Sequence, residues 1–450
     1  MNKVITYGTY DLFHEGHYKL LKRAKELGDY LIVGVTTENY DESRGKLNVQ
    51  QSLMERIENV RESGLADKII IEEYEGQKIS DIQKYDVDIF AIGSDWLGKF
   101  DYIKEYCEVV YLERTKGISS TQLRLENSGL TKMGVAGYGR IANRFVKEAR
   151  FVSGVSIEGV FGPNEASLKE FIETHELAFY ETEYEEFLSK IDAVYIATPH
   201  LTHYEYIKKA LQTGVHVLCE KPMVLSKKQA EELYTLAKEN NLVLLEAIKT
   251  AFSPGFDRLI SVAKSGLIGK IKNIDATFTK LVDGDIRELD KDQAGGSMTE
   301  LGTYPLLAFM KLLGTNYKEV NYYSYFDDEK KVDLFTKFNL IYDHAIASGK
   351  VGLGVKSEGD LIISGTKGYI YVPSPWWKTE YFEMRFEDFN NNKKYYYKFD
   401  GDGLRYELSE FLHLINNNEA QSYRLTQVES VKIIEIIEGF LEGNGLKTLS

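Results

Sequence analysis

The chain has 450 residues, enough for about three domains, and its formal net charge is −14 with a pI of about 5.3. This acidic balance argues against nucleic acid as the main partner, because a phosphate backbone requires a basic protein surface. The two cysteines give no disulfide framework, and the sequence has neither a signal-peptide pattern nor an apolar run long enough for a membrane helix. We therefore expect a cytoplasmic protein with no membrane partner.

Residues 1–128 have the pattern of one compact α/β domain. An apolar strand over residues 3–7 leads through the turn GTYDLFHEGH into a helix whose apolar residues share one face, namely Leu20, Leu21, Ala24 and Leu27. Buried strands follow over residues 29–37, 87–93 and 108–114. The turn-forming residues 127–129 then indicate a short linker. We predict a Rossmann-like α/β fold for this domain.

Two further domains follow. A second strand–turn–helix opening begins at Lys132, and the alternation that follows it predicts a Rossmann domain with a parallel sheet over residues 132–250. Over residues 251–450 the pattern changes to strands of a largely antiparallel sheet and ends in two helices, which predicts an α+β domain for substrate binding and oligomerisation. Because such a sheet needs its second face covered, we expect a homo-oligomer.

The turn over residues 8–17 combines groups that suit phosphate chemistry. His14 and His17 flank Gly16 where a helix begins, so backbone N–H groups and the helix dipole favour a phosphate there. Two imidazoles are able to donate hydrogen bonds to oxygens that gain charge during phosphoryl or nucleotidyl transfer. Taken alone, the two histidines are better explained as packing residues, and a metal pair lacks further ligands in this stretch.

Polar residues elsewhere in the domain favour the phosphate interpretation. The segment RTKGISSTQLR follows the last strand and places hydroxyl groups where a helix should start, at Ser119, Ser120 and Thr121. Further cations are supplied by Arg44, Lys46, Arg56 and Arg114. Each of them alone is better explained as a solvated charge, whereas together with the histidine turn they indicate an anionic nucleotide.

The motifs GTYDLFHEGH, IGSDWLGKFD and CEVVYLERTKGISSTQLR, in this order, resemble the glycerol-3-phosphate cytidylyltransferase family across residues 1–125. The resemblance implies that CTP, with Mg²⁺, reacts with an alcohol phosphate to give a CDP-alcohol and pyrophosphate. It implies catalytic roles for His14, His17, Lys46 and Arg114, and nucleotide contacts by Thr9, Tyr10, Asp11, Gly16, Arg56, Asp95, Trp96, Thr115, Ser119, Ser120 and Thr121. Ser94–Asp95 replaces the family's paired acids, which leaves the identity of the acceptor open. No side chain is assigned as a metal ligand.

A GxGxxA turn opens the second domain. Gly137, Gly139 and Ala142 follow a strand and begin a helix, the context that the dinucleotide-binding fingerprint requires. The predicted cofactor contacts in this turn are Gly137, Tyr138, Gly139, Arg140 and Ile141. Gly162 stands where an acidic residue would bind the ribose, and no arginine follows to hold a 2′-phosphate. NAD and NADP are therefore both left open.

Lys221 is the candidate proton donor of the second domain. It follows Glu220 at the C-terminal end of a parallel strand, where ligands of open α/β sheets bind. A lysine there is able to exchange a proton with a carbonyl or hydroxyl group, although in isolation a surface lysine in a turn is the better explanation. Glu300 and Tyr304 are four residues apart, so on a helix they share one face.

The segments GVAGYGRIA, IATPHLTH, EKP and GGSMTELGTYP resemble the family of glucose-fructose oxidoreductase and inositol dehydrogenase (Gfo/Idh/MocA) over residues 132–450. The resemblance implies Lys221 as general acid/base, Tyr304 as a substrate-facing donor, and further cofactor contacts by Thr198, Pro199, His203, Glu220 and Lys221. Many relatives have Asp and His where this chain has Glu300 and Tyr304, so a histidine-based proton relay is not carried over. We expect His200 and His203 to pack at the cofactor site rather than bind zinc.

Together the motifs suggest a bifunctional enzyme of CDP-polyol synthesis. The second and third domains would reduce a ketose or ketose phosphate with NAD(P)H, and the first would join a polyol phosphate to CMP. By resemblance, such donors feed teichoic-acid-like or capsular polymers. Two alternatives stay open: the oxidoreductase acts on an unrelated sugar, or it has lost turnover and serves as a scaffold.

Overall fold

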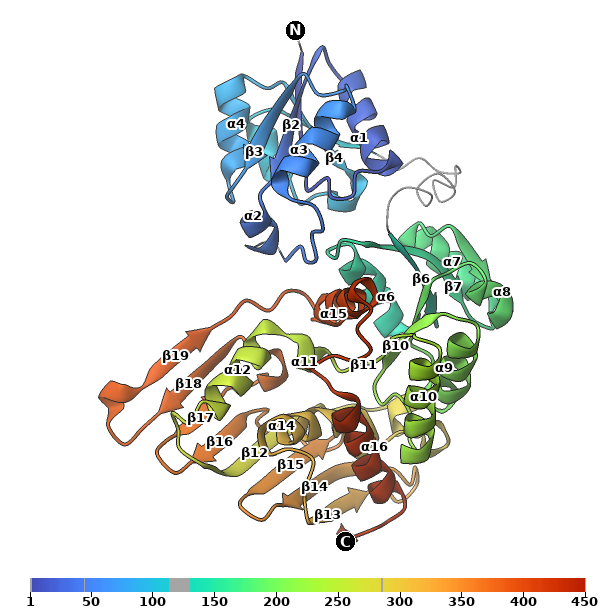
Figure 1. Ribbon diagram of the computed structural model, residues 1–450, viewed down its shortest axis with the longest axis vertical. Helices are drawn as coiled ribbons and strands as arrows, with labels where there is room; N and C mark the ends of the chain where they lie inside the picture. Colours follow the sequence, from blue (N-terminus) through green and yellow to red (C-terminus); the bar gives the residue numbers. More distant parts are fainter. Residues whose placement is uncertain (1, 44, 113–129, 285, 450) are drawn as a thin grey trace. The chain divides into compact units, whose positions relative to one another are not determined.

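The structure is a computed structural model of the chain, and it describes residues 2–43, 45–112, 130–284 and 286–449 (Figure 1). The chain divides into two compact units. The first comprises Met1–Lys132 with Ala149–Glu158 and Glu176–Ala178, and the second comprises Met133–Glu148, Gly159–His175 and Phe179–Ser450. The three-domain division with boundaries near residues 130 and 250 stays a prediction. Among the described residues, no helix has the length and apolar character needed to cross a lipid bilayer.

The first unit alternates strands and helices: β1 (Lys3–Gly8), α1 (Glu15–Glu26), β2 (Tyr30–Thr36), α2 (Glu38–Ser43), α3 (Leu53–Glu62), β3 (Lys68–Glu72), α4 (Gln77–Tyr85), β4 (Ile89–Gly93) and β5 (Glu108–Leu112). The strands form a parallel sheet of order β3-β2-β1-β4-β5. Neighbouring apolar residues of a strand point to opposite faces of this sheet. Val4 and Leu31 therefore belong to one core cluster, and Ile5 and Ile32 belong to the other. Leu21 of α1 joins the first cluster, as the predicted apolar face requires.

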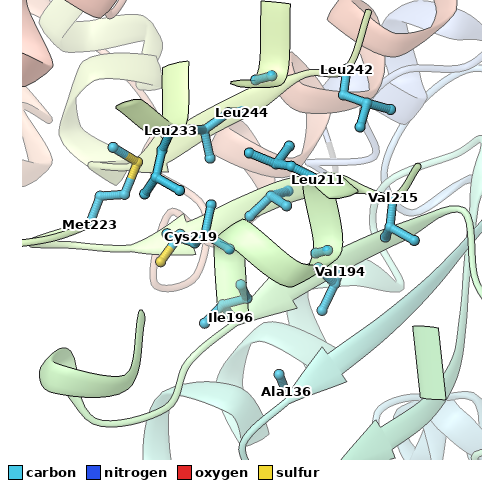
Figure 2. Close-up of a cluster of buried hydrophobic side chains, with 14 of the residues drawn as sticks. Ala136, Val194, Ile196, Leu211, Val215, Cys219, Met223, Leu233, Leu242 and Leu244 are labelled. Carbon is cyan, nitrogen blue, oxygen red and sulfur yellow. The ribbon is translucent and has the colours of Figure 1, made fainter. Parts of the chain in front are cut away.

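A second alternation follows, with β6 (Thr131–Ala136), α6 (Arg140–Ala149), β7 (Val155–Phe161), α7 (Glu165–His175), β8 (Phe179–Glu181), α8 (Tyr184–Leu188), β9 (Ala193–Ile196), α9 (His203–Gln212), β10 (His216–Glu220), α10 (Lys227–Glu239) and β11 (Leu244–Ala247). The sheet order is β11-β10-β9-β6-β7-β8. The order reverses between β6 and β9, which is where ligands bind in doubly wound folds. Figure 2 shows part of the core, in which Val194 and Cys219 of the strands face Leu211 and Leu233 of α9 and α10.

The remaining strands form one mixed sheet: β12 (Ile271–Thr279), β13 (Glu319–Phe326), β14 (Asp333–Ile341), β15 (Ile346–Gly352), β16 (Leu361–Gly365), β17 (Tyr369–Val372), β18 (Tyr381–Arg385), β19 (Lys393–Tyr396) and β20 (Leu446–Leu449). Their order is β19-β18-β17-β16-β12-β15-β14-β13-β20. The prediction of a largely antiparallel sheet is confirmed, with parallel pairing only between β12 and β15 and between β13 and β20 among the described strands.

Helices pack on this sheet and beside it (Figure 1), namely α11 (Lys249–Phe252), α12 (Pro254–Lys264), α13 (Ser297–Leu301), α14 (Thr303–Leu313), α15 (Leu404–Asn417) and α16 (Gln427–Leu441). Glu300 and Tyr304 lie on two consecutive helices rather than on one. The break at Gly302 has a physical cause: Pro305 has no N–H, so it leaves the Leu301 carbonyl without the usual bond from four residues ahead.

Candidate active sites

The histidine turn joins β1 to α1 through residues with left-handed backbone. Tyr10 and Leu12 have φ angles of 53° and 44°, which cost free energy in residues that carry a side chain. The ring of Tyr10 lies over Gly8, where an added Cβ would be 2.9 Å from the ring carbon Cζ. Tyr10 is 1% exposed, and burial raises the pKa of its hydroxyl. Tyr10 therefore packs inside the turn and supports it.

His14 and His17 stack on each other at the start of α1. Their ring centroids are 3.9 Å apart with planes 20° from parallel, and the Tyr10 ring contacts His17 edge-on at 5.4 Å. His14 is the N-cap residue, and its Nδ1 accepts a hydrogen bond from the Gly16 amide at 3.1 Å. A neutral His14 therefore carries its proton on Nε2. The pair presents ring N–H groups at a helix N-terminus, where an anion is favoured.

A buried polar network holds the loops around the histidine turn. The Asp41 carboxylate accepts hydrogen bonds from the hydroxyls of Thr9 and Thr36, at 2.9 and 2.7 Å. Arg56 is fully buried, and its Nη1 donates to the carbonyl oxygens of Thr9 and Thr36 at 2.9 and 2.8 Å. Thr9 and Arg56, which the sequence predicts to contact nucleotide, thus have partners inside the protein. Their direct contact with nucleotide stays a prediction.

Asp11 has partners of the same kind. Its two carboxylate oxygens accept hydrogen bonds from the main-chain amides of residues 50 and 51, at 3.0 and 2.9 Å. Lys46 is half-buried, and its amide donates to the carbonyl of Asp41 at 2.8 Å. Asp95 and Trp96 belong to the short turn Ser94–Trp96 that follows β4. The predicted residues outside the described part of the chain are Arg44, Arg114, Thr115, Ser119, Ser120 and Thr121.

The glycine turn between β6 and α6 is close-packed on one side and open on the other. Gly137 has a φ angle of 101°, and an added Cβ would lie 2.7 Å from the carbonyl oxygen of Ala197. At Gly139, no described atom lies within 4 Å of an added Cβ. Ala142 is fully buried one turn into the helix. This arrangement leaves room for a pyrophosphate at the helix N-terminus.

Tyr138 gives a physical reason for the glycine at position 162. An added Cβ on Gly162 would lie 2.4 Å from Cε1 of Tyr138. The aromatic ring therefore occupies the place of the acidic side chain expected at the end of β7. Arg140 and Ile141 open α6, and the guanidinium of Arg140 forms an ion pair with Glu288 at 3.0 Å.

His203 ties two loops of the same site together. It is fully buried, with Nε2 2.8 Å from the carbonyl oxygen of Thr198 and Nδ1 3.1 Å from that of Pro222. Burial lowers the pKa of this imidazole. Pro199 follows Thr198 and precedes the short turn His200–Thr202. His203 thus holds the loop after β9 against the turn after β10, and its predicted contact with the cofactor stays a prediction.

Lys221 and Tyr304 lie close together. The ammonium of Lys221 donates a hydrogen bond to the main-chain carbonyl of Glu300 at 2.7 Å, and its Nζ is 5.8 Å from the centre of the Tyr304 ring. Burial raises the pKa of the Tyr304 hydroxyl, which keeps it protonated as a donor. The carboxylate of Glu220 accepts a hydrogen bond from the hydroxyl of Tyr195 at 2.6 Å. The fold therefore brings a cation and a phenol to the carboxyl end of β10.

Arg287 joins this site, although no pattern in the sequence indicated it. Its Nη1 lies 2.8 Å from Oε1 of Glu300 and 3.4 Å from Nδ1 of His200. Burial, followed by the charge of Arg287, lowers the pKa of His200 to about 2, so this imidazole is neutral and accepts from the guanidinium. Arg287 belongs to a short turn, Arg287–Leu289, which comes close to Glu300 only through the folding of the chain.

Comparison with known proteins assigns both parts of the chain. Residues 5–126 match the family described as cytidylyltransferase-like, residues 131–247 match the NAD-binding Rossmann fold of the GFO/IDH/MocA oxidoreductase family, and residues 256–371 match the GFO/IDH/MocA C-terminal domain. A glycerol-3-phosphate cytidylyltransferase from Bacillus spizizenii is 54% identical over 130 residues, which are 29% of this chain and 100% of the relative. The chain belongs to both families. It is a cytidylyltransferase fused to an NAD(P)-dependent oxidoreductase.

The oxidoreductase has similarity to reductases of nucleotide-linked sugars. A dTDP-3,4-didehydro-2,6-dideoxy-alpha-D-glucose 3-reductase from Actinomadura kijaniata is 37% identical over 128 residues, which are 28% of this chain and 38% of the relative. The solved structure of a 3-ketoreductase from Actinomadura kijaniata, in complex with NADP and TDP-benzene, superposes with a TM-score of 0.64 at 22% identity. That match covers 71% of this chain and 99% of the other chain, so the shared fold includes the mixed sheet.

The residues of the oxidoreductase fit an NAD(P) cofactor. The open space at Gly139 and the close packing at Gly137 suit a pyrophosphate, and Lys221 and Tyr304 lie near the carboxyl ends of the parallel strands. In the cytidylyltransferase, His14 and His17 lie at a helix N-terminus that suits the phosphates of a nucleotide. Among the described residues, no group of three or more His, Cys, Asp or Glu side chains is arranged to hold a metal ion.

Proposed function

We propose that this chain is a bifunctional enzyme of CDP-polyol synthesis. The oxidoreductase would make a polyol from a ketose or ketose phosphate, and the cytidylyltransferase would convert a polyol phosphate into a CDP-polyol. The observation that carries the proposal is that one chain combines a domain similar to a glycerol-3-phosphate cytidylyltransferase over the whole length of that relative with an oxidoreductase similar to a reductase of a didehydro sugar. With a ketose phosphate as the starting compound, the two reactions are consecutive steps on one small molecule. We propose cytoplasmic synthesis of donors for a teichoic-acid-like or capsular polymer.

In cytidylyl transfer, a phosphate oxygen of the acceptor attacks the α-phosphorus of CTP, and the bond to the pyrophosphate leaving group breaks. Negative charge grows on the oxygens of the transferred phosphoryl group, and donors fixed in place stabilise it. His14 and His17 would donate from the start of α1. Lys46 and the segment from Arg114 to Thr121 would bind the remaining phosphates and the cytidine, and Mg²⁺ would enter with the triphosphate. Thr9, Asp11 and Arg56 would act by holding the loops.

In ketone reduction, the bound NAD(P)H would supply a hydride to the carbonyl carbon. The ammonium of Lys221 would donate a proton to the carbonyl oxygen and regain one from solvent, so that a ketone, NAD(P)H and a proton give an alcohol and NAD(P)⁺. The Tyr304 hydroxyl would donate a hydrogen bond to the same oxygen. Glu300 would position Lys221 through its main-chain carbonyl while its carboxylate pairs with Arg287.

A second candidate function reverses the order of the two steps. CTP would first react with a ketose phosphate, and the oxidoreductase would then reduce the ketone of the CDP-linked product. One observation favours this order: the relative that is 37% identical over 128 residues is named for a substrate that already carries a nucleotide.

We also propose that the chain forms a homo-oligomer through the mixed sheet. On one face of that sheet, register places Tyr323, Tyr325, Tyr369 and Tyr371 among charged residues. Tyr325 and Tyr369 are 45% and 37% exposed, and a second copy would cover them. Sedimentation velocity should show a dimer or larger species, and Tyr369→Glu should shift it toward monomer.

The test of function combines substrates and detects every product. The protein is incubated with CTP, Mg²⁺ and glycerol, tetritol or pentitol phosphates, and separately with NAD(P)H and dihydroxyacetone, ribulose or their phosphates. Pyrophosphate release and NAD(P)H oxidation report the two half-reactions, and mass detection in the combined mixture reports the CDP-linked product. Absence of pyrophosphate with every acceptor would exclude the proposed transfer. NAD(P)H oxidation only after CTP is added would favour the reversed order.

A further inference from the structure

The first turn of α15 carries a buried carboxyl that the fold does not satisfy. Glu407 has no exposed surface. Neither of its side-chain oxygens has a hydrogen-bond partner within the part of the chain that the structure describes. No ion pair within 4.0 Å is formed by Glu407 among those residues. A buried carboxyl without a partner costs free energy, because it loses its hydration and gains nothing in return.

Glu407 lies next to the reduction site. The helix α15 packs against α11, which Lys249 opens, and against β10, which ends at Glu220. Burial, followed by the charges of Glu220 and Glu407, raises the pKa of the Tyr304 hydroxyl. Burial also raises the pKa of Glu407, and the positive charge of Lys249 opposes that shift. The helix that carries Glu407 therefore packs against the strand that ends directly before Lys221, and the charge of Glu407 influences Tyr304.

Other carboxyls around this site, buried or partly buried, have partners. Glu220 accepts a hydrogen bond from the Tyr195 hydroxyl. Glu148 accepts from the guanidinium of Arg405 at 2.9 Å. Glu246 accepts hydrogen bonds from the amide of Met223 at 2.9 Å and from the hydroxyl of Ser430 in α16. The fold is thus able to satisfy carboxyls in this region, and the lack of a partner at Glu407 points to a group that arrives with a ligand.

We propose that Glu407 is a specificity-determining residue of the reduction site, where its carboxyl group forms hydrogen bonds with hydroxyl groups of a polyhydroxylated substrate. The inference rests on the proposed ketose reduction and deepens it by naming what the site recognises beyond the ketone. A carboxyl group has two oxygens, so it is able to form hydrogen bonds with two hydroxyl groups of one substrate. The positive charge of Lys249 opposes the rise that burial causes in the pKa of this carboxyl, while Lys221 and Tyr304 act on the carbonyl oxygen.

Two variants separate recognition from folding. Glu407→Gln keeps the shape of the side chain but replaces one carboxyl oxygen by an amide nitrogen, and Glu407→Met removes all polar atoms at similar volume. The matched control is Glu410→Gln on the same helix, because the carboxylate of Glu410 is satisfied by the hydroxyl of Ser422 and by Arg424.

The first readout is the melting temperature of the full chain with NADP⁺, with and without ribitol, arabinitol and glycerol. We expect pentitols to raise the melting temperature of the wild type and of Glu410→Gln, and to have no effect on Glu407→Gln. Without polyol, Glu407→Met should melt about 2 to 4 °C higher than the wild type, because an unsatisfied group has been removed. Glu410→Gln should melt lower than the wild type.

The second readout is kinetic. For Glu407→Gln we expect the KM for ribulose to rise at least tenfold while the KM for hydroxyacetone, which has a single hydroxyl, stays within twofold. Equal effects of Glu407→Gln and Glu410→Gln on the KM, or a lower melting temperature of Glu407→Met without polyol, would overturn the inference.

Failure of the proposed reduction is distinguishable from failure of this inference. If the wild type reduces no ketose, the proposed reduction fails. The rise in melting temperature with polyol, and its loss in Glu407→Gln, then still decide whether Glu407 binds hydroxyl groups. A wild type whose melting no polyol changes would contradict the inference as well.

Discussion

The ammonium of Lys221 lies 2.7 Å from the main-chain carbonyl oxygen of Glu300, a residue on α13. A carbonyl oxygen only accepts, so it orients the ammonium without taking its proton. The carboxylate of the same glutamate pairs with Arg287 at 2.8 Å. Glu300 thus positions Lys221, the candidate acid, through its main-chain carbonyl and Arg287 through its side chain.

Replacement of Lys221 should abolish reduction without disturbing the cofactor. We expect Lys221→Met to lower kcat for NAD(P)H-dependent ketone reduction by about 10² to 10⁴, the range that a positioned general acid contributes. The dissociation constant of NADPH, measured by fluorescence titration, should stay within about twofold. Lys208→Met is the control, because Lys208 pairs with Glu232 on the surface and should have no effect. Full turnover by Lys221→Met would show that another group supplies the proton.

Replacement of His17 should affect only cytidylyl transfer. We expect His17→Ala to lower kcat for pyrophosphate release by about 10² to 10³, the loss seen when one donor to a charged transition state is removed. NADPH binding and ketone reduction in the same preparation should be unchanged. His413→Ala, on α15, is the matched control and should leave pyrophosphate release at the wild-type rate. A transfer rate that survives the loss of His17 would identify the histidine stack as packing only.

The glycine at position 162 predicts tolerance of a 2′-phosphate on the cofactor. A carboxylate there would repel that phosphate, so we expect Gly162→Asp to weaken NADPH binding by at least about tenfold, or 1.4 kcal/mol, and to weaken NADH binding less. Because any side chain at this position meets the ring of Tyr138, Gly162→Ala serves as the control for crowding. If both variants weaken the two cofactors equally, crowding rather than charge accounts for the loss.

The buried carboxyl of Asp333 should make stability depend on pH. Burial raises the pKa of Asp333 to about 7, although the hydrogen bonds that it accepts from the Thr336 hydroxyl and the Met298 amide act to lower it. The native state therefore holds a proton that the unfolded chain releases near pH 4. The contribution to stability is complete below about pH 4 and is lost as the pH rises to about 7.

The measurement is the melting temperature at pH 5 and pH 8 for the wild type and Asp333→Asn. Asparagine keeps an acceptor for the Met298 amide but does not titrate. We expect the wild type to lose about 2 to 4 °C more than the variant between the two pH values, on the scale of one kcal/mol in a chain of this size. Parallel melting curves at both pH values would show that Asp333 stays in one protonation state.

Local sequence patterns were sufficient to predict many of the turns, helices and strands of this protein. The histidine turn, the GxGxxA turn and the alternation of strands and helices depend on neighbours in the chain, such as an N-cap at His14 or a positive φ angle at Gly137. For the same reason the apolar face of α1 and the largely antiparallel character of the last sheet followed from periodicity. The break at Gly302 was also encoded locally, by the missing N–H of Pro305, but the spacing of Glu300 and Tyr304 alone suggested one helix.

The partners of polar side chains were decided only by the tertiary structure. Arg56 donates hydrogen bonds to the carbonyls of Thr9 and Thr36, and Arg287 forms an ion pair with Glu300. Glu407 is buried near Lys249 without a hydrogen-bond partner among the described residues. Hydrogen bonds and the cost of burying a charge depend on distance through space and on the exclusion of water, and neither quantity is a function of position along the chain. The sequence by itself therefore determined which chemical groups this protein carries and which turns present them, and the packing of distant segments decided which groups are held by the protein and which are left for a ligand.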